Sequence, residues 1–189
     1  MQKWEKFFDE CVKEIAKEDV VLDIGSGQPF QKGLGKYKAL FAASRYYSLD
    51  YDSSYRPDII GDIHNLPFKD GSAGAIICKA VLEHVPEPQR AIREMYRVLK
   101  KDGKILAYVP FLYGYHGAKN YKDYYRFTKD GVGYMFRDFV RTEIVENRGY
   151  FGTLALFVPG SKYLAPLANF FDRFTGYGVT SGYNIFAVK

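Results

Sequence analysis

A short apolar run that ends in two closely spaced glycines restricts the possible folds of this chain more than any other segment. Val20 to Ile24 is mostly β-branched and is followed at once by Gly25 and Gly27. Such a run predicts a strand that is buried on both faces of a parallel sheet. The glycines permit main-chain angles that other residues avoid, and Pro29 suits the first turn of a following helix. The segment therefore predicts a ligand site between a strand and a helix N-terminus.

Length and composition place the chain among single-domain globular proteins. Its 189 residues are enough for one domain with a substantial core, and 47% hydrophobic with 26% charged residues excludes a disordered chain. The net charge of +5 would suit an anionic partner, but the basic residues are dispersed, so we expect no stable nucleic-acid partner. Cys11 and Cys78 lie in apolar patterns and are interpreted as reduced core thiols of a cytoplasmic protein. No apolar stretch reaches membrane-spanning length.

Apolar patterning along the chain predicts strands that alternate with helices, the arrangement of a parallel α/β sheet. The predicted helices are Trp4 to Ile15 (within an N-terminal segment 1–18), a weak one over Phe30 to Ala42, one that opens at Pro86 and Pro88 and ends at Lys100 to Gly103, and one capped by Thr128 that carries Phe136 and Phe139. The predicted strands after the first are Arg45 to Asp50, Ile59 to Ile60, Ala75 to Cys78, Lys104 to Val109, Arg141 to Glu146 and Tyr183 to Val188.

Two segments do not fit this alternation. Residues 110–128 are crowded with tyrosine, glycine and charge, and predict a long loop of the kind that carries function. Residues 150–178 form an apolar insertion in which Lys162 and Arg173 are the nearby cations. The insertion can serve as a peripheral membrane contact, as a homodimer face or as a cap over a pocket.

Four motifs in order give the chain a family resemblance. Asp23, Gly25 and Gly27 match the first; Asp50 matches the second; the run from Gly61 to Phe68 matches the third; and Val81 to Pro86 matches the fourth. Together they resemble a class I S-adenosylmethionine-dependent methyltransferase, in particular small methyltransferases often associated with glycan or cell-surface biosynthesis that carry a segment like Asp123 to Thr128. The resemblance implies a Rossmann-like, doubly wound α/β fold of seven strands, mostly parallel with an antiparallel last strand. A nicotinamide cofactor is disfavoured, because Phe30 occupies the last glycine position of that fingerprint.

The resemblance also implies which residues hold S-adenosylmethionine. Asp50 would accept hydrogen bonds from the ribose hydroxyls, Asp62 from the adenine amino group, and the Ile63 N–H would meet a ring nitrogen. The alternatives are a solvated turn for Asp50 and an Asx-turn for Asp62. The full predicted cofactor set is Asp23, Gly25, Ser26, Gly27, Asp50, Tyr51, Asp62, Ile63 and Lys79. Within it Asp23 acts indirectly or structurally, and Lys79 borders the methionine part or lies on the surface.

Methyl transfer to a hydroxyl benefits from a general base, for which the sequence offers three candidates. His116 in the tyrosine-rich loop ranks first, ahead of His84 and Asp123, with a purely structural histidine as the alternative. The three histidines are scattered along the chain without the spacing of metal ligands, so no metal is expected. Aromatic faces and hydroxyls suit sugar rings, and arginine suits phosphate. The predicted acceptor-pocket residues are Tyr113, Tyr115, Tyr121, Tyr124, Tyr125 and Arg126.

The sequence therefore predicts a cytoplasmic methyltransferase that uses S-adenosylmethionine on a small-molecule or glycan-type hydroxyl. Two alternatives stay open: a cofactor-binding interaction module without catalysis, and an RNA methyltransferase suggested by the net charge. The Asn/Asp-Pro-Pro-Phe/Tyr motif of N-methyltransferases is absent after the fourth predicted strand, which favours oxygen or carbon acceptors.

Overall fold

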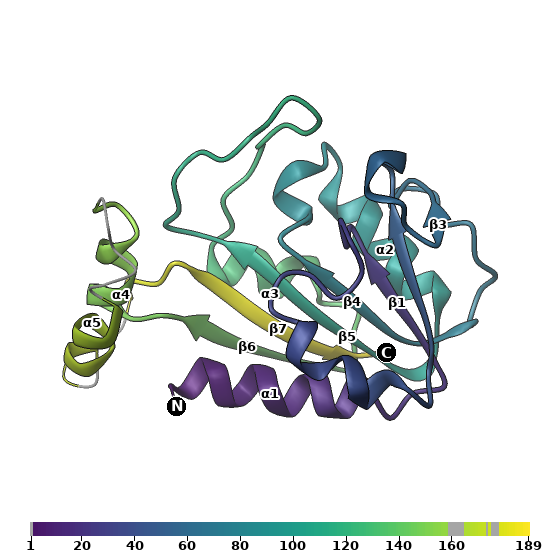
Figure 1. Ribbon diagram of the computed structural model, residues 1–189, viewed down its shortest axis with the longest axis horizontal. Coiled ribbons are helices and arrows are strands. Elements are labelled where there is room, and N and C mark those ends of the chain that lie inside the picture. Colours follow the sequence, from purple (N-terminus) through teal and green to yellow (C-terminus); the bar gives the residue numbers. More distant parts are fainter. Residues whose placement is uncertain (1, 159–164, 173, 175–177) are drawn as a thin grey trace.

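A seven-stranded sheet forms the centre of the protein in the computed structural model, which describes residues 2–158, 165–172, 174 and 178–189 (Figure 1). The strands are β1 (Val20–Ile24), β2 (Arg45–Asp50), β3 (Ile59–Ile60), β4 (Ala73–Lys79), β5 (Leu99–Pro110), β6 (Arg141–Asn147) and β7 (Gly182–Val188). Their order across the sheet is β3-β2-β1-β4-β5-β7-β6, and β7 runs antiparallel to both of its neighbours. The predicted mostly parallel Rossmann-like sheet with an antiparallel last strand is confirmed.

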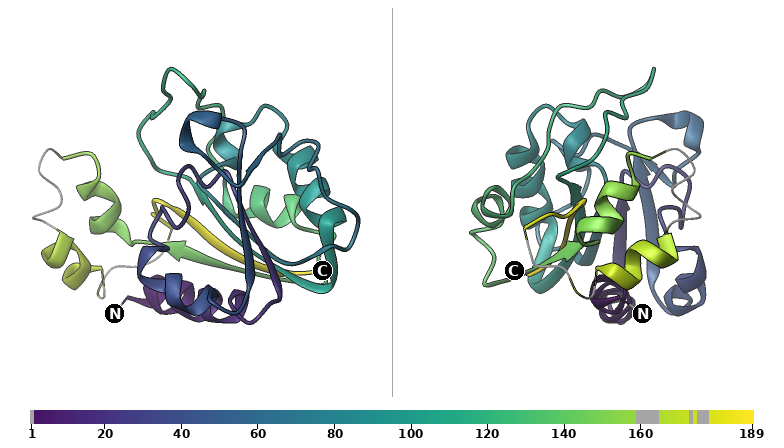
Figure 2. Two further views of the ribbon diagram at one scale, coloured as in Figure 1. Left: turned by 45° about the vertical axis from the view of Figure 1, so that its right-hand side comes forward. Right: turned by 90° about the vertical axis from the view of Figure 1, so that its left-hand side faces the viewer.

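Helices cover both faces of this sheet (Figures 1 and 2). The helix α1 (Lys3–Ile15) and the 3₁₀ turn η1 (Gly35–Phe41) lie on one face, and α2 (Pro88–Val98) and α3 (Lys129–Met135) lie on the other. Short 3₁₀ turns η2 (Ser53–Tyr55) and η3 (Leu82–His84) follow β2 and β4, and the pair α4 (Tyr150–Ala155) and α5 (Ala165–Phe171) precedes β7. Thr128 caps α3 as predicted, since its Oγ1 accepts from the Gly131 N–H at 3.1 Å.

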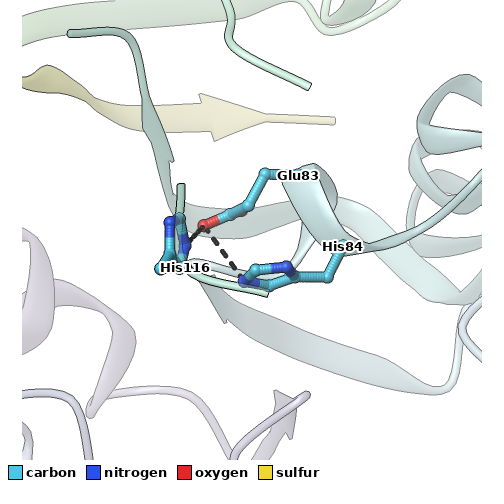
Figure 3. A group of neighbouring side chains, drawn as sticks. All are labelled: Glu83, His84 and His116. Atoms are coloured by element: carbon cyan, nitrogen blue, oxygen red, sulfur yellow. Dashed lines mark ion pairs between the residues drawn. The ribbon is translucent and has the colours of Figure 1, made fainter. Parts of the chain in front are cut away.

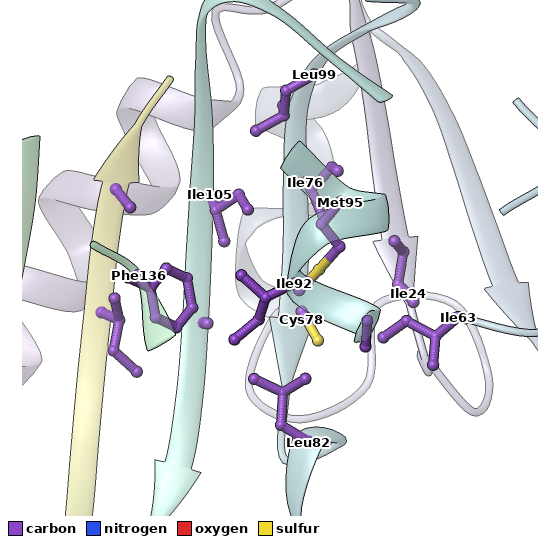
Figure 4. Packing of buried hydrophobic residues seen from close by; sticks show 14 of the residues in the cluster. Ile24, Ile63, Ile76, Cys78, Leu82, Ile92, Met95, Leu99, Ile105 and Phe136 are labelled. Carbon is purple, nitrogen blue, oxygen red and sulfur yellow. The ribbon is translucent and has the colours of Figure 1, made fainter. Parts of the chain in front are cut away.

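Two hydrophobic clusters fill the spaces between sheet and helices, because successive strand residues point to opposite faces. Val21 and Ile77 pack with α1 and η1, whereas Leu22 and Ile76 pack with α2 and α3. Met95 on α2 lies at the middle of the second cluster (Figure 4). Because the central strands are buried on both faces, their ends rather than their faces are free to form a site.

The weak helical region predicted over Phe30 to Ala42 begins later than expected, and only as the 3₁₀ turn η1. Phe30 and Lys32 both adopt left-handed conformations, with φ of 60° and 54°, which a right-handed helix excludes. Turns occupy this segment until η1 begins at Gly35. The ring of Phe30 instead stacks on Tyr46 of β2, with the ring centroids 4.2 Å apart. The glycine turn therefore does not present a helix N-terminus to the ligand.

The helix that was predicted to end at Lys100 to Gly103 is shorter than expected, and Gly103 does not terminate it. The helix ends at Val98 and β5 begins at the next residue, so Leu99 belongs to the strand. The left-handed residue of this turn is Asp102, with φ of 61°. A Cβ on Gly103 would lie 2.8 Å from the Lys100 carbonyl oxygen. Gly103 is therefore required by close packing of the backbone and does not terminate a helix.

The helices α4 and α5 pack against each other and project from one end of the sheet (Figure 1). The Asp172 carboxylate accepts hydrogen bonds from the N–H groups of Gly149, Phe151 and Gly152, which satisfies the first turn of α4. Leu154, Phe157, Val158, Leu167, Phe170, Phe171 and Phe174 are exposed there. Lys162 and Arg173, named above as nearby cations, lie outside the described residues. None of the helices that the structure describes has the length and apolarity to cross a membrane.

Candidate functional site

A cavity of about 800 Å³ lies at the carboxyl ends of β1, β2, β3 and β4, beneath the loop that follows β5. This volume is in the range of ligand sites. From the strand ends it is lined by Ile24, Gly25, Gly27, Leu49, Asp50, Tyr51, Gly61, Asp62, Ile63, Ala80, Val81 and His84, and from the loop by His116, Lys119, Asn120, Tyr121, Lys122 and Tyr124. The cavity thus joins predicted cofactor residues and predicted catalytic residues in one space.

The glycine turn after β1 forms one wall of the cavity. Gly25 and Gly27 have φ of 63° and 62°, in the left-handed region that favours glycine. A Cβ on Gly25 would lie 2.4 Å from Cγ2 of Val81, on the turn after β4. Glycine is therefore needed at position 25 both for its backbone angle and for the contact between the ends of β1 and β4.

Asp50 ends β2 beside this turn and is 5% exposed. Its Oδ2 accepts from the Gly27 N–H at 2.9 Å, and its Oδ1 accepts from the Asp52 N–H at 3.1 Å. Each carboxylate oxygen has a second lone pair, and Asp50 lines the cavity. The backbone thus fixes the orientation of a carboxylate that still has capacity for two ligand hydroxyls.

Asp62 forms the Asx-turn considered as its alternative role, and it lines the cavity as well. Its Oδ1 accepts from the His64 N–H at 2.9 Å and lies 2.7 Å from His64 Nδ1. Burial alone would raise the pKa of Asp62, but the hydrogen bonds from His64 outweigh it and lower that pKa. The carboxylate is ionised and keeps acceptor capacity beside Ile63, which is 6% exposed.

Three predicted cofactor residues lie behind the described cavity wall. Asp23 accepts a hydrogen bond from the Tyr46 hydroxyl, and burial raises its pKa to about 6. Ser26 is buried and its hydroxyl donates to the Gly27 carbonyl. The Lys79 ammonium lies 3.9 Å from the centroid of the Phe8 ring and donates to the Lys32 carbonyl at 2.6 Å, and burial lowers its pKa to about 8. Lys79 is therefore engaged with Phe8 and Lys32 and is not among the residues that line the described cavity.

Lys32 lines the cavity, whereas Lys79 does not, and no sequence pattern predicted this role for Lys32. Its Nζ donates to the carbonyl oxygens of Gly25 at 2.7 Å, Lys79 at 2.7 Å and Ala80 at 3.1 Å. These contacts tie the ends of β1 and β4 together. They depend on the left-handed conformation of Lys32, which periodicity does not reveal.

The tyrosine-rich loop is anchored to the strand ends at two places. The N–H groups of Tyr124 and Tyr125 donate to the Glu83 carbonyl at 2.8 and 3.3 Å. At the other place the Tyr51 hydroxyl donates to the Asn120 carbonyl, and Asn120 Nδ2 donates to Asp52 Oδ2 at 2.8 Å. The loop therefore closes the cavity from above the ends of β2 and β4.

The carboxylate of Asp123 is occupied by hydrogen bonds within this loop, which argues against its predicted role as a general base. Its oxygens accept from Arg126 Nη1 and Nη2 at 2.6 and 2.7 Å, and from the His116 N–H at 2.9 Å. The guanidinium holds the pKa of Asp123 well below its usual range. Arg126 also donates to the carbonyls of Tyr113 and Gly114. Both side chains thus shape the loop, and such an acidic carboxyl makes a poor proton acceptor.

Of the five predicted acceptor tyrosines, Tyr121 and Tyr124 belong to the described cavity lining. Tyr115 is 77% exposed, and Tyr125 donates its hydroxyl to the Pro86 carbonyl at 2.7 Å. The Tyr113 ring contacts His116, with centroids 5.2 Å apart. Tyr121 lines the cavity and packs on His84.

Glu83, His84 and His116 come together at the cavity wall (Figure 3). The Nε2 atoms of both histidines lie 3.7 Å from Glu83 Oε1. Glu83 is 1% exposed, and the carboxylate raises the pKa of His116. One potential ligand atom from each residue lies within 4.8 Å of the others. Histidine spacing in the sequence did not reveal this arrangement, which arises because the loop returns His116 to His84.

Comparison with known proteins gives a consistent result. The family described as "Methyltransferase domain" matches residues 22–107, from β1 into β5. Demethylmenaquinone methyltransferase of Thermotoga maritima is 32% identical over 115 residues, which cover 55% of this chain and 48% of that protein. The tRNA (carboxymethyluridine(34)-5-O)-methyltransferase alkbh8 of Xenopus tropicalis is 30% identical over 111 residues, 56% of this chain and 18% of that protein. This chain thus spans about half or less of the length of these relatives.

Among solved structures, a SAM-dependent methyltransferase from Archaeoglobus fulgidus superimposes with a TM-score of 0.63. The alignment covers 100% of both chains at 14% identity. At that identity the likeness concerns the fold, and it extends through the segments on either side of residues 22–107.

Proposed function

This chain has the fold of class I S-adenosylmethionine-dependent methyltransferases with a methyltransferase domain over residues 22–107, and from that premise we propose that it transfers the donor's methyl group to a hydroxyl of a small-molecule or glycan-type acceptor. One observation carries the proposal. The glycine turn, Asp50 and Asp62 share a cavity with His84 and His116. A donor site and a polar acceptor wall are thus combined in one space.

The donor would lie along the strand ends. Two main-chain N–H groups hold the Asp50 carboxylate in place and use one lone pair on each oxygen. The remaining lone pairs accept hydrogen bonds from the ribose hydroxyls. Asp62 and the Ile63 N–H receive the adenine, in the part of the cavity formed by the turn after β3. The methionine part lies beside Gly25 and Gly27, where Lys32 replaces Lys79 as the neighbouring cation. Asp23 and Ser26 support this turn from behind.

The acceptor would lie beneath residues 110–128. Tyr124 and Tyr121 offer aromatic faces to it, and the imidazoles of His84 and His116 meet its hydroxyl. Methyl transfer forms a carbon–oxygen bond in line with the breaking carbon–sulfur bond, so the protein's main contribution is alignment and exclusion of water. Alignment alone can supply about 7–11 kcal/mol. The cluster of Glu83, His84 and His116 assists as a general base that accepts the hydroxyl proton, which contributes about 10²–10⁴-fold in rate.

The outer segments of the chain have separate proposed tasks within one domain, 1–189. The exposed apolar residues of α4 and α5 form a contact surface for a membrane interface or a second copy of the chain. No described residue of 150–178 lines the cavity, which disfavours a cap. Cys11 and Cys78 are buried free thiols, and burial raises both pKa values to about 12, which supports work in a reducing compartment such as the cytoplasm.

Two measurements test the proposal. Isothermal titration with S-adenosylmethionine should show one site per chain, and Asp50→Asn should weaken it while the exposed Tyr115→Phe control leaves it unchanged. A product assay for S-adenosylhomocysteine should then respond to hydroxylated acceptors such as saccharides or phenols. Cofactor binding without turnover on any acceptor class would support the interaction module instead. Absence of cofactor binding would overturn the proposal.

A further inference from the structure

We propose that Glu83, His84 and His116 bind one divalent transition-metal ion, with the acceptor's oxygen completing its coordination. The inference deepens the proposed methyl transfer and rests on it for the role of the ion, although the ion site itself stands on the geometry of the three side chains. Two imidazole nitrogens and one carboxylate are a donor set that Zn²⁺ and similar ions prefer, whereas Mg²⁺ and Ca²⁺ prefer oxygen ligands.

The first support is the orientation of the two imidazoles. His84 Nδ1 lies 2.6 Å from the Lys122 carbonyl oxygen, and His116 Nδ1 lies 3.0 Å from the Gly114 carbonyl oxygen. A carbonyl oxygen only accepts, so each Nδ1 must carry the proton. In the neutral rings, Nε2 then presents a lone pair, and both Nε2 atoms point toward Glu83. This is the tautomer that metal-bound histidines require.

The second support is the Glu83 carboxylate itself. It is 1% exposed, and neither oxygen receives a hydrogen bond from the described residues. An ionised carboxylate removed from water without donors is unfavourable unless a cation compensates it. The Nε2 lone pairs of the two histidines and the anionic Glu83 oxygen would repel one another. A single divalent ion among them would coordinate all three atoms. The 3.7 Å separations are close to the roughly 3.4 Å between ligand atoms of a tetrahedral site with bonds of about 2.1 Å.

The third support is an outer layer of contacts around the ligands. His116 Nδ1 lies 3.3 Å from Asp123 Oδ2, and Asp123 is held by two hydrogen bonds from Arg126. A carboxylate behind a ligating histidine fixes the ring and raises the basicity of the ligand. The Asp123–Arg126 pair, which shapes the loop, thereby also positions His116.

The position of the cluster indicates what the ion would do. His84 and His116 line the cavity, and three protein ligands leave a coordination position open toward it. An acceptor hydroxyl bound there becomes more acidic and gives up its proton to bulk solvent. Its oxygen then bonds to the methyl carbon, and the carbon–sulfur bond breaks with its electron pair remaining on sulfur. With the ion bound, the two histidines are ligands and do not take up the proton.

Metal binding tests this site independently of turnover. Protein freed of metal with a chelator would be titrated with Zn²⁺ by calorimetry, and Co²⁺ would serve as a spectroscopic probe of nitrogen and oxygen ligands. We expect one ion per chain and at least 10–100-fold weaker binding in Glu83→Gln, His84→Ala and His116→Ala. His64→Ala removes the remaining histidine and should leave stoichiometry and affinity for Zn²⁺ unchanged. Circular dichroism of each variant verifies folding, and His116→Ala in the loop remains informative if Glu83→Gln does not fold.

The outcomes separate the two proposals. S-adenosylmethionine binding by the chelated protein reports on the proposed function alone. Two outcomes would overturn the ion site: cofactor binding with no uptake of Zn²⁺ or Co²⁺, and metal uptake that survives replacement of both histidines. The cluster would then be a Glu83–His116 ion pair. Stoichiometric uptake that is lost in the three variants supports the site, and a matching loss of turnover in metal-free protein that Zn²⁺ restores supports its role on the acceptor.

Discussion

The proposed donor half of the cavity and its proposed acceptor half are built in different ways. Around the glycine turn, buried strand ends hold the site through main-chain groups: the Gly27 N–H orients Asp50, and three carbonyls receive Lys32. Beneath the tyrosine-rich loop, side chains hold the site: Arg126 fixes Asp123, and Asp123 receives the His116 N–H. A common cofactor can thus be held by a fixed backbone, while acceptor specificity can change with loop side chains.

The largest expected effect tests the rigidity of the donor half. Gly25→Ala adds a Cβ 2.4 Å from Val81 Cγ2 and imposes a left-handed alanine. We expect a loss of about 3–4 kcal/mol in the free energy of unfolding and loss of measurable cofactor binding. Denaturant titration and calorimetry measure both. Gly114→Ala in the acceptor loop is the matched control, since a Cβ there meets nothing within 4 Å. Equal effects of both variants would contradict the comparison.

A pH experiment concerns the buried Asp23 behind the glycine turn. Burial raises its pKa from 3.8 to about 6, so between these values the folded protein retains a proton that the unfolded chain has released. The free energy of unfolding should therefore fall as pH rises from about 4 to about 6, by up to about 3 kcal/mol from this group. In Asp23→Asn, which can still accept from Tyr46, this contribution should vanish. Urea titrations of both proteins at several pH values measure it, and a pH-independent difference would refute the assignment.

Asp50→Asn tests whether the carboxylate at the end of β2 recognises the donor. Replacing a charged acceptor by a neutral one should weaken cofactor binding about 10–100-fold, because hydrogen bonds to charged groups contribute about 1.5–3 kcal/mol. Tyr124→Phe on the acceptor side should leave cofactor affinity within about twofold and change only turnover. Calorimetry and initial rates distinguish them. If Tyr124→Phe weakens cofactor binding as much as Asp50→Asn does, the two halves of the cavity do not act independently.

The smallest effect is expected in the acceptor half. Asp123→Asn weakens the pairing with Arg126 and the contact to the His116 N–H. We expect local opening of the loop, with amide hydrogen exchange at His116 and Tyr124 faster by about tenfold, equivalent to about 1.4 kcal/mol. Amides of β1 and β4 should exchange as in the unaltered protein. Accelerated exchange throughout the sheet would show that the loop is not an independent unit.

The sequence predicted the donor half better because its signals are local. β2 and β3 have the predicted bounds, since Tyr46, Tyr47 and Leu49 mark the first and two isoleucines mark the second, and Asp50 ends β2 as predicted. The turn after Gly27 was missed because nothing in the sequence marks left-handed Phe30 and Lys32. The cluster of Glu83, His84 and His116 was missed because His116 is distant in the chain from the adjacent Glu83 and His84. They meet only through the path of a loop whose anchors are main-chain hydrogen bonds.

The contacts of Asn120 link the two halves energetically. Its carbonyl receives the Tyr51 hydroxyl and its amide donates to Asp52, next to the carboxylate of Asp50. A ligand that orders residues 51 and 52 therefore also favours the closed loop. Such coupling is reciprocal by thermodynamic necessity. An acceptor that stabilises the closed loop must then raise the affinity for the donor by the same factor. The protein should therefore retain its methyl donor longest when an acceptor is already bound.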